Sequence, residues 1–303
     1  MADQTSLTFD RDFAPAYGIA ENLTPLIRRV VCRNPGPFTF TGTASFILGE
    51  KTLAVIDPGP NDEPHLSALL KAIGNKPLSH IFITHTHVDH SPLARRLKAL
   101  TGAETVGFGA PTSTSGEESG AVRLDASRDA DFRPDIALKD GETIESSEWA
   151  LTGIHTPGHT SDHMAFALAR ERVLFPGDHV MAWSTSVVTP PDGSMGQYLR
   201  SLDALLRRDD EIYFPTHGPP RREPRALVRA LLAHRRMREG AILARLKGEP
   251  KSLKELVAAI YAEVDPRLHA AAGQTTLAHL QHLIAQGKVV REAKGAGDYY
   301  RLS

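Results

Sequence analysis

The stretch Thr84-His85-Thr86-His87-Val88-Asp89-His90 holds four side chains that commonly bind metals. It follows the apolar run 81–84, which predicts a buried strand, and it precedes Ser91-Pro92, which predicts the N-cap and first residue of a helix. In extended backbone the first two histidines point to the same side, and the aspartate and third histidine follow where the chain turns. Imidazole and carboxylate are preferred ligands of zinc and similar divalent ions. The stretch therefore predicts a metal site at a strand end.

Three later segments each place one further ligand type after a predicted strand, beside proline or glycine. They are Thr156-Pro157-Gly158-His159-Thr160, Phe175-Pro176-Gly177-Asp178 and Phe214-Pro215-Thr216-His217-Gly218. One such histidine alone is usually a satisfied polar group, but three positions after the first cluster make a coherent set. The set predicts two divalent metal ions, with zinc expected and manganese or iron as alternatives. The seven candidate ligands are His85, His87, Asp89, His90, His159, Asp178 and His217.

Short apolar runs alternate with amphipathic segments from residue 36 to about 220, which indicates an α/β layered domain. Helices are predicted after Ser91-Pro92 and over the segments 63–73 and 196–207. Residues 110–135 interrupt the pattern and are expected to form a long surface loop. Strands are expected at 39–48, 52–56, 81–84, 149–154, 164–168, 172–175 and 212–214.

The last part of the chain has a different organisation. A long helix is predicted at 224–247, and two shorter ones at Leu253–Tyr261 and Thr275–Ala285. Two strands, 288–292 and 299–302, then flank a glycine-containing turn. Helices followed by a hairpin are the layout of a winged-helix module. The expected domains are 1–222, which carries the metal ligands, and 223–303, a linker helix with a small winged-helix-like domain.

Charge is distributed unevenly along the 303 residues, although the net charge is only −1. Residues 1–220 hold 19 Lys and Arg against 28 Asp and Glu, whereas 221–247 hold nine against two. The basic segment indicates either an anionic partner or a solvated arginine-rich helix face. Cys32 is the only cysteine, which excludes an intrachain disulfide and a thiolate metal cluster. Because there is neither a long apolar run nor a signal-like N-terminus, we expect a cytoplasmic protein without membrane contact.

The order of these ligands resembles the metallo-β-lactamase superfamily, with its HxHxDH motif, later histidine, aspartate and final histidine. The resemblance implies an αββα sandwich with the metals at one edge. It implies that His85, His87 and His159 hold the first metal, that Asp89, His90 and His217 hold the second, and that Asp178 bridges them. Asp57, in Ile56-Asp57-Pro58-Gly59, matches the family's aspartate that orients a ligand histidine from behind. Its alternative role is turn formation.

A narrower resemblance covers nearly the whole chain. The segments Asn34–Thr43 and His234–Glu239 and the terminal module are similar to the β-lactamase-like protein 2 group, whose characterised eukaryotic members cleave single-stranded RNA. Val88 and His179 stand where that group usually carries other residues. The Gln274–Gln286 helix has no Arg or Lys, so we expect the module to pack or dimerise rather than to read DNA.

The predicted function is that of a dinuclear-metal hydrolase, in which a hydroxide bridging two divalent ions attacks a carbonyl or phosphorus. The first hypothesis is phosphodiester cleavage of single-stranded RNA. The alternative is hydrolysis of a thioester, ester or lactone of the glyoxalase II type, with a small thiol conjugate as substrate. Hydrolysis of β-lactams is a weaker alternative, and a homo-oligomer is left open.

Further residues are expected around the metals. Asp89 is expected to act in catalysis as well as in binding, and His163 to donate a proton to the leaving group; a hydrogen-bonded loop histidine is the alternative. His179 is expected behind the ligands. Possible substrate contacts are Trp183, His234 and Arg235. Surface or helix-face positions are expected for five other histidines: His65, His80, His269, His279 and His282.

Overall fold

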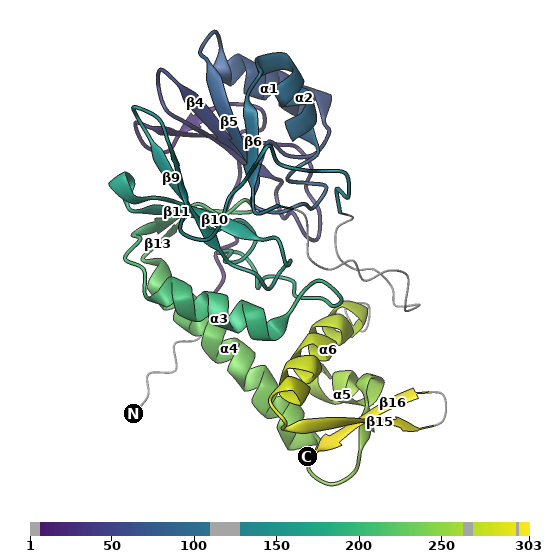
Figure 1. Cartoon of the computed structure of the whole chain (residues 1–303). Helices are drawn as coiled ribbons and strands as arrows, with labels where there is room; N and C mark the ends of the chain where they lie inside the picture. Colours follow the sequence, from purple (N-terminus) through teal and green to yellow (C-terminus); the bar gives the residue numbers. More distant parts are fainter. Residues whose placement is uncertain (1–6, 110–127, 263–268, 295–296) are drawn as a thin grey trace.

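The chain folds into two β-sheets that face each other, with helices on both outer faces and a smaller C-terminal body (Figure 1). The computed structural model describes residues 7–109, 128–262, 269–294 and 297–303. Most of the predicted loop 110–135 therefore lies outside the described residues. The sandwich is the αββα arrangement that the resemblance implied.

The first sheet has seven strands within the described residues, joined in chain order. The first four run antiparallel, whereas β4 to β7 run parallel. The strands are β1 (Glu21–Asn22), β2 (Ile27–Val31), β3 (Ala44–Leu48), β4 (Leu53–Ile56), β5 (Leu78–Phe82), β6 (Glu104–Gly107) and β7 (Ile136–Ala137). Helices α1 (Glu63–Ile73) and α2 (Leu93–Thr101) pack on its outer face.

The second sheet has six described strands in the order β13-β12-β11-β10-β9-β8, and only β11 and β12 pair in parallel. Helices α3 (Met195–Leu206) and α4 (Pro224–Arg245) cover its outer face. A single 3-10 turn, η1 (Ala169–Glu171), links β10 to β11. The strands are β8 (Thr143–Glu145), β9 (Ala150–His155), β10 (Met164–Leu168), β11 (Val173–Phe175), β12 (Ile212–Tyr213) and β13 (Arg221–Arg222).

Each central strand is apolar on both faces because both faces are covered. In β3, Phe46 points between the sheets, while its neighbour Ile47 packs under α1 and α2. In β10, Phe166 lies between the sheets and Ala165 faces α3 and α4. Successive side chains of a strand point to opposite faces, so a strand buried on both sides becomes a continuous apolar run. This explains why such runs could be located in the sequence without an alternating pattern.

Two local predictions were wrong, one at the start of a strand and one at the start of a helix. The strand expected at 39–48 begins only at Ala44, because Gly36 and Phe40 pair across a turn and the Gly42 backbone has φ +131°. Ser91 does not cap α2, which begins at Leu93 without a side-chain cap. The Ser91 hydroxyl instead donates to Asp129 at 3.0 Å. The sequence analysis also did not anticipate β2, although it is almost fully buried.

The C-terminal body is a winged-helix fold. It contains β14 (Lys251–Ser252), α5 (Leu253–Ile260), α6 (His269–Ala285), β15 (Val289–Lys294) and β16 (Gly297–Leu302). Its core shares apolar side chains with the last turns of α4, among them Ile242 and Leu246. Helix α6 also contacts α3 and α4 of the sandwich (Figure 1). Among the described helices, none combines the length and apolarity needed to cross a bilayer.

Candidate metal centre

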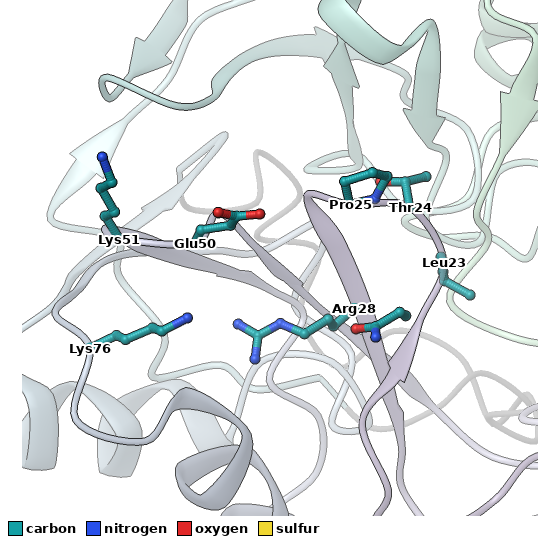
Figure 2. A pocket seen from close by; sticks show the side chains of 9 residues that line it. Leu23, Thr24, Pro25, Arg28, Glu50, Lys51 and Lys76 are labelled. Atoms are coloured by element: carbon teal, nitrogen blue, oxygen red, sulfur yellow. The ribbon is translucent and has the colours of Figure 1, made fainter.

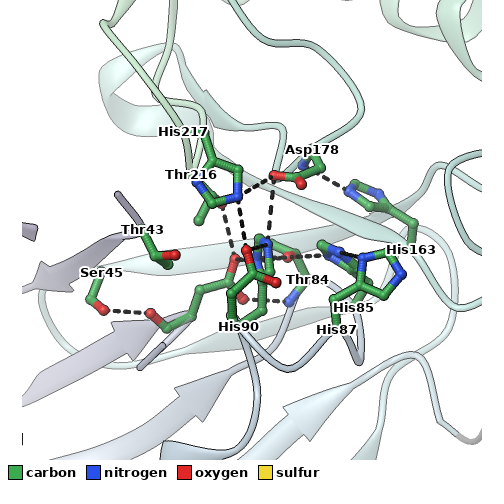
Figure 3. Close-up of polar contacts among 12 residues, drawn as sticks. Thr43, Ser45, Thr84, His85, His87, His90, His163, Asp178, Thr216 and His217 are labelled. Atoms are coloured by element: carbon green, nitrogen blue, oxygen red, sulfur yellow. Dashed lines mark hydrogen bonds and ion pairs between the residues drawn. The ribbon is translucent and has the colours of Figure 1, made fainter. Parts of the chain in front are cut away.

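The predicted ligands converge at one edge of the sandwich, on loops that leave the carboxyl ends of β5, β9, β11 and β12. Figure 3 shows five of them directed at a common centre: His85, His87, His90, Asp178 and His217. Parallel neighbours such as β4 and β5 end at the same edge, which brings loops that are distant in sequence together. The ligand atoms form three groups, and within each group all of the atoms lie within 4.8 Å of one another. The groups are His85, His87 and His159; His85, His90 and Asp178; and Asp89, His90 and His217.

The first group consists of three buried imidazoles. The Nε2 atom of His85 lies 2.9 Å from Nδ1 of His87, which lies 3.1 Å from Nε2 of His159. Burial, followed by the neighbouring His159, lowers the pKa of His87 to about 3, and burial also lowers the pKa of His85 well below its ordinary value. Both rings are therefore neutral at pH 7 and present free lone pairs, as metal ligation requires.

The second group combines imidazoles with carboxylates. The Oδ2 atom of Asp89 lies 3.1 Å from Nε2 of His217 and 3.6 Å from Nε2 of His90. The Oδ1 atom of Asp178 lies 3.5 Å and 3.6 Å from the same two nitrogens. Its other oxygen, Oδ2, lies 3.9 Å from Nε2 of His159. Asp178 thus presents one oxygen to each group, which is the placement that a bridging ligand needs.

The donor atoms of this cluster fit two divalent cations. Tetrahedral zinc with ligands at about 2.0–2.1 Å separates its donor atoms by roughly 3.4 Å, close to the separations found here. Four of the buried polar atoms lack any hydrogen-bond partner among the described residues, which is costly unless an ion satisfies them. These atoms are Asp89 Oδ1, His90 Nε2, Asp178 Oδ1 and His217 Nε2. The residues present therefore fit the pair of metals that the sequence predicts.

Asp57 lies directly behind this cluster and is completely buried. Its carboxylate is 2.8 Å from Nδ1 of His90 and accepts the Thr84 N–H at 2.8 Å and the Thr84 hydroxyl at 2.7 Å. The Thr216 hydroxyl donates to it at 3.0 Å. An acceptor on Nδ1 fixes the ring and leaves Nε2 for a metal. Because Asp57 has φ +48°, it also forms the turn after β4.

Three further orienting contacts were not recognised in the sequence. Backbone carbonyls of Val187 and Gly42 lie 2.5 Å and 3.1 Å from Nδ1 of His159 and His217. Backbone acceptors carry no side-chain signal, so sequence patterns cannot reveal them. Asp162 accepts the Thr86 N–H at 3.2 Å and hydroxyl at 2.7 Å, and so fixes the residue between two ligands. The position of Asp162 between His159 and His163 in the sequence was the feature that could have indicated this role.

The structure favours the hydrogen-bonded alternative for His163 over the proton-donor role that the sequence suggests. The ring is fully buried, with Nδ1 2.8 Å from the Thr156 hydroxyl, and its Nε2 accepts the Asp178 N–H at 3.2 Å. Burial, followed by the neighbouring His179, lowers its pKa well below the ordinary value. His163 is therefore a neutral support for the Asp178 backbone, which is the hydrogen-bonded alternative.

His179 is buried behind His163 and packs against the ring of Tyr198 at 4.5 Å between centroids. Neither of its ring nitrogens has a hydrogen-bond partner among the described residues. Two of the histidines expected at surface or helix-face positions, His65 on α1 and His279 on α6, are buried. His65 Nε2 lies 2.9 Å from the Ser45 hydroxyl, which donates to the Asp57 carbonyl.

Trp183 lies beside the ligand His217. Its ring stacks on Phe40 at 4.8 Å between centroids and 9° between planes, and it packs against Gly218. A methyl group on Gly218 would come within 2.8 Å of the Trp183 ring. Both aromatic side chains are half-buried, and the stacked pair forms an aromatic wall against Gly218, the residue that follows His217. Phe40 was not selected in the sequence analysis, because nothing local distinguishes it from a strand residue.

Arg235, named above as a possible substrate contact, is buried and contacts the backbone of this chain. It is 3% exposed, and its Nη2 donates to the Ser186 carbonyl at 2.5 Å. The neighbouring His234 is half-buried. Burial, followed by Arg235, Arg238 and His279, lowers its pKa to about 4. These contacts place both residues at the junction of α4 and α6.

A surface hollow lies apart from the metal cluster, beside the β1–β2 and β3–β4 turns (Figure 2). Three cationic residues, Arg28, Lys51 and Lys76, line it together with Glu50, and Figure 2 shows the Arg28 and Lys76 side chains directed toward each other. None of the predicted site residues lines this hollow.

We expect Asp57→Asn to weaken metal binding by about 10- to 100-fold, because an amide cannot accept from His90 and both threonines as the carboxylate does. The affinity is measured by competition with a chromophoric chelator. Asp210→Asn is the matched control, since Asp210 is also a buried carboxylate but pairs with Arg208 at 2.7 Å. Equal metal affinity in both variants would contradict the assigned role.

We expect metal binding near pH 7 to release protons. Burial disfavours the charged form of His217, but Asp178 and Asp89 outweigh it and raise its pKa from 6.5 to about 10; the same carboxylates raise the pKa of His90. In the metal-free protein this pairing is fully stabilising below pH 6.5 and is lost as the pH rises toward 10. A metal must displace these protons.

Titration calorimetry in buffers of different ionisation enthalpy measures the number of protons released. The number should fall as the pH approaches 10. A release that is zero at pH 7 would show that the two imidazoles are already neutral.

The metallo-beta-lactamase superfamily model matches residues 38–217, and the beta-lactamase associated winged helix domain model matches 252–297. An atrochrysone carboxyl ACP thioesterase from Claviceps purpurea is 26% identical over 83% of this chain and 77% of its own length. A beta-lactamase-like protein 2 homolog from Drosophila melanogaster is 27% identical over 92% of this chain and 94% of its own.

Among solved structures, a metallo-beta-lactamase family protein from Thermus thermophilus superposes with a TM-score of 0.75. It is 25% identical and matches over 93% of this chain and 100% of its own. The first family model spans more than half of the chain and includes all seven ligands that converge at the sandwich edge. The chain therefore belongs to the metallo-beta-lactamase superfamily and is a hydrolase of that superfamily with an appended winged-helix domain.

Proposed function

We propose that the protein is a dinuclear metal-dependent hydrolase of thioesters or esters that carry an apolar or aromatic acyl group. The observation that carries this proposal is the stacked pair Phe40 and Trp183 beside His217. A flat apolar wall next to the metal cluster favours a substrate whose reacting group is attached to an apolar body. Zinc is the metal that we propose for both sites.

When bound, two divalent ions lower the pKa of coordinated water and polarise the scissile carbonyl. The residues of this chain hold and orient them. His85, His87 and His159 would hold the first, Asp89, His90 and His217 the second, and Asp178 would contact both. Asp57 keeps the His90 ring in one orientation through the bond at Nδ1. The acyl group would lie against Phe40 and Trp183.

The distribution of positive charge argues for an acyl substrate over a polyanion. The basic segment 221–247 suggested an anionic partner, yet α4 turns its apolar face to the second sheet and its exposed arginines to solvent. Arg236 pairs with Asp203, and Arg225 donates to a backbone carbonyl. A helix face that points away from the sheet does not border ligands at the sheet edge. This supports the solvated-face interpretation of the basic segment.

The thioesterase named among the relatives agrees with this proposal. The Claviceps purpurea protein is named for thioester cleavage on an acyl carrier protein, and this chain matches 77% of its length. At 26% identity the match does not transfer the substrate, and the acyl group for this chain is inferred from the aromatic wall.

Cleavage of single-stranded RNA is the second candidate. The Drosophila melanogaster homolog matches 92% of this chain, which includes the winged-helix domain, and the resemblance to its group implies RNA as substrate. The same aromatic wall could stack on a base. This candidate requires cationic contacts to the phosphate backbone, which the basic face of α4 is not placed to supply.

The two candidates are separated by one experiment on zinc-loaded protein. Acyl-thioesters of increasing chain length and labelled single-stranded RNA are supplied in parallel, with Asp89→Ala as the control for metal dependence. We expect thioester hydrolysis that improves with acyl length and is lost in the control. RNA cleavage that the control abolishes, without thioester turnover, would instead establish the second candidate.

We expect Phe40→Ala to raise the KM for long acyl substrates about tenfold while kcat changes little, because the lost wall binds the acyl group and not the reacting carbonyl. Leu100→Ala, an exposed apolar residue on α2, is the control. An equal loss for short and long acyl groups would show that the pair does not contact the acyl chain.

A further inference from the structure

Arg235 is linked to the metal cluster through the segment that contains Ser186 and Val187. Its Nη2 donates to the Ser186 carbonyl at 2.5 Å, and the next carbonyl, that of Val187, lies 2.5 Å from Nδ1 of His159. Successive carbonyls of one segment therefore contact a residue of α4 and a candidate ligand. A shift of this segment would rotate or release the His159 ring.

A second path connects the same two residues. The Arg235 guanidinium carbon lies 5.2 Å from the centroid of the Tyr198 ring on α3. The backbone of Tyr198 packs so closely on Gly158 that a methyl group there would lie 2.4 Å from the Tyr198 Cα. Gly158 immediately precedes His159, and its carbonyl accepts the Ser194 N–H at 2.8 Å. Arg235 thus supports both sides of the loop that presents His159.

Burial of an arginine requires a reason. A guanidinium is costly to remove from water unless its donors are satisfied, and its planar fork is suited to fixed, directional contacts. Arg235 is 3% exposed, yet its Nε has no hydrogen-bond partner among the described residues. A hydrophobic side chain would pack between α3 and α4 at lower cost. The arginine is therefore better explained by its contacts to the Ser186 carbonyl and the Tyr198 ring than by packing.

The winged-helix domain fixes the helix that carries Arg235. One turn further along α4, the Glu239 carboxylate lies 2.7 Å from Nδ1 of His282 and 3.4 Å from Nδ1 of His279, both on α6. The His282 ring also packs on the start of α3, where a methyl group on Gly196 would lie 2.8 Å from it. Helix α6 therefore contacts both helices that meet at Arg235.

We propose that Arg235 is a positioning residue for His159, and that α6 holds Arg235 in place through Glu239. The winged-helix domain then contributes to metal binding without contacting the metals. The inference rests on the metal centre of the proposed function and is independent of the substrate class.

The test compares Arg235→Met with Arg236→Met in the full-length chain. Arg236 is the next residue, but its side chain is 65% exposed and pairs with Asp203 at 3.7 Å. Metal-free protein is titrated with zinc against a chromophoric chelator, and with cobalt to record the ligand-field spectrum. We expect Arg235→Met to weaken the binding of one of the two ions by about 10- to 100-fold and to change the cobalt spectrum of that site. Arg236→Met should match the unchanged protein.

Two further variants keep the test decisive. Arg235→Lys can still donate to a carbonyl, so it should recover part of the lost metal affinity. Glu239→Gln should weaken the binding of the same ion that Arg235→Met affects. These variants replace Arg235→Met if that protein does not fold. The proposal is overturned if unfolding midpoints fall while both metal affinities and the cobalt spectrum stay unchanged, since Arg235 would then be structural only. Failure of the substrate assay alone would leave this result intact.

Discussion

A single buried carboxylate, that of Asp57, joins the strand ends on which the metal cluster depends. It accepts hydrogen bonds that originate from the end of β5, from the ligand His90 and from the segment after β12. A buried charge is tolerated only when several donors satisfy it, so the carboxylate holds these elements at fixed separations. The edge of the sandwich is thereby organised by the protein itself. The ligands need little rearrangement to receive ions.

The electrostatics of the cluster divide its histidines into two kinds. Burial, followed by neighbouring imidazoles, lowers the pKa values of His85 and His87, so both are neutral before a metal binds. His90 and His217 face Asp89 and Asp178, and their pKa values rise, so they hold protons when no ion is present. In the metal-free protein the protons provide the positive charge that the carboxylates require. Ions and protons therefore compete at His90 and His217.

The same edge also receives support from outside the sandwich. The Val187 carbonyl that orients His159 lies in a segment whose preceding carbonyl is held by Arg235. Apolar side chains of α4 take part in two cores, one under the second sheet and one in the winged-helix domain. A helix shared by two cores transmits the position of one domain to the other because packed interiors resist small shifts. The winged-helix domain is thus part of the architecture of the site.

The sequence by itself determined the candidate ligand set, the strand-end positions of its members and the alternation of strands and helices. It could do so because the residue type decides which side chains can bind a metal, and because a strand buried on both faces is a continuous apolar run. Only the tertiary structure decided that His163 is a buried support, that Arg235 points inward and that Phe40 faces Trp183. Whether a side chain meets solvent, a carbonyl or another ring depends on which distant segments pack against it. Residue type and local spacing do not contain that information.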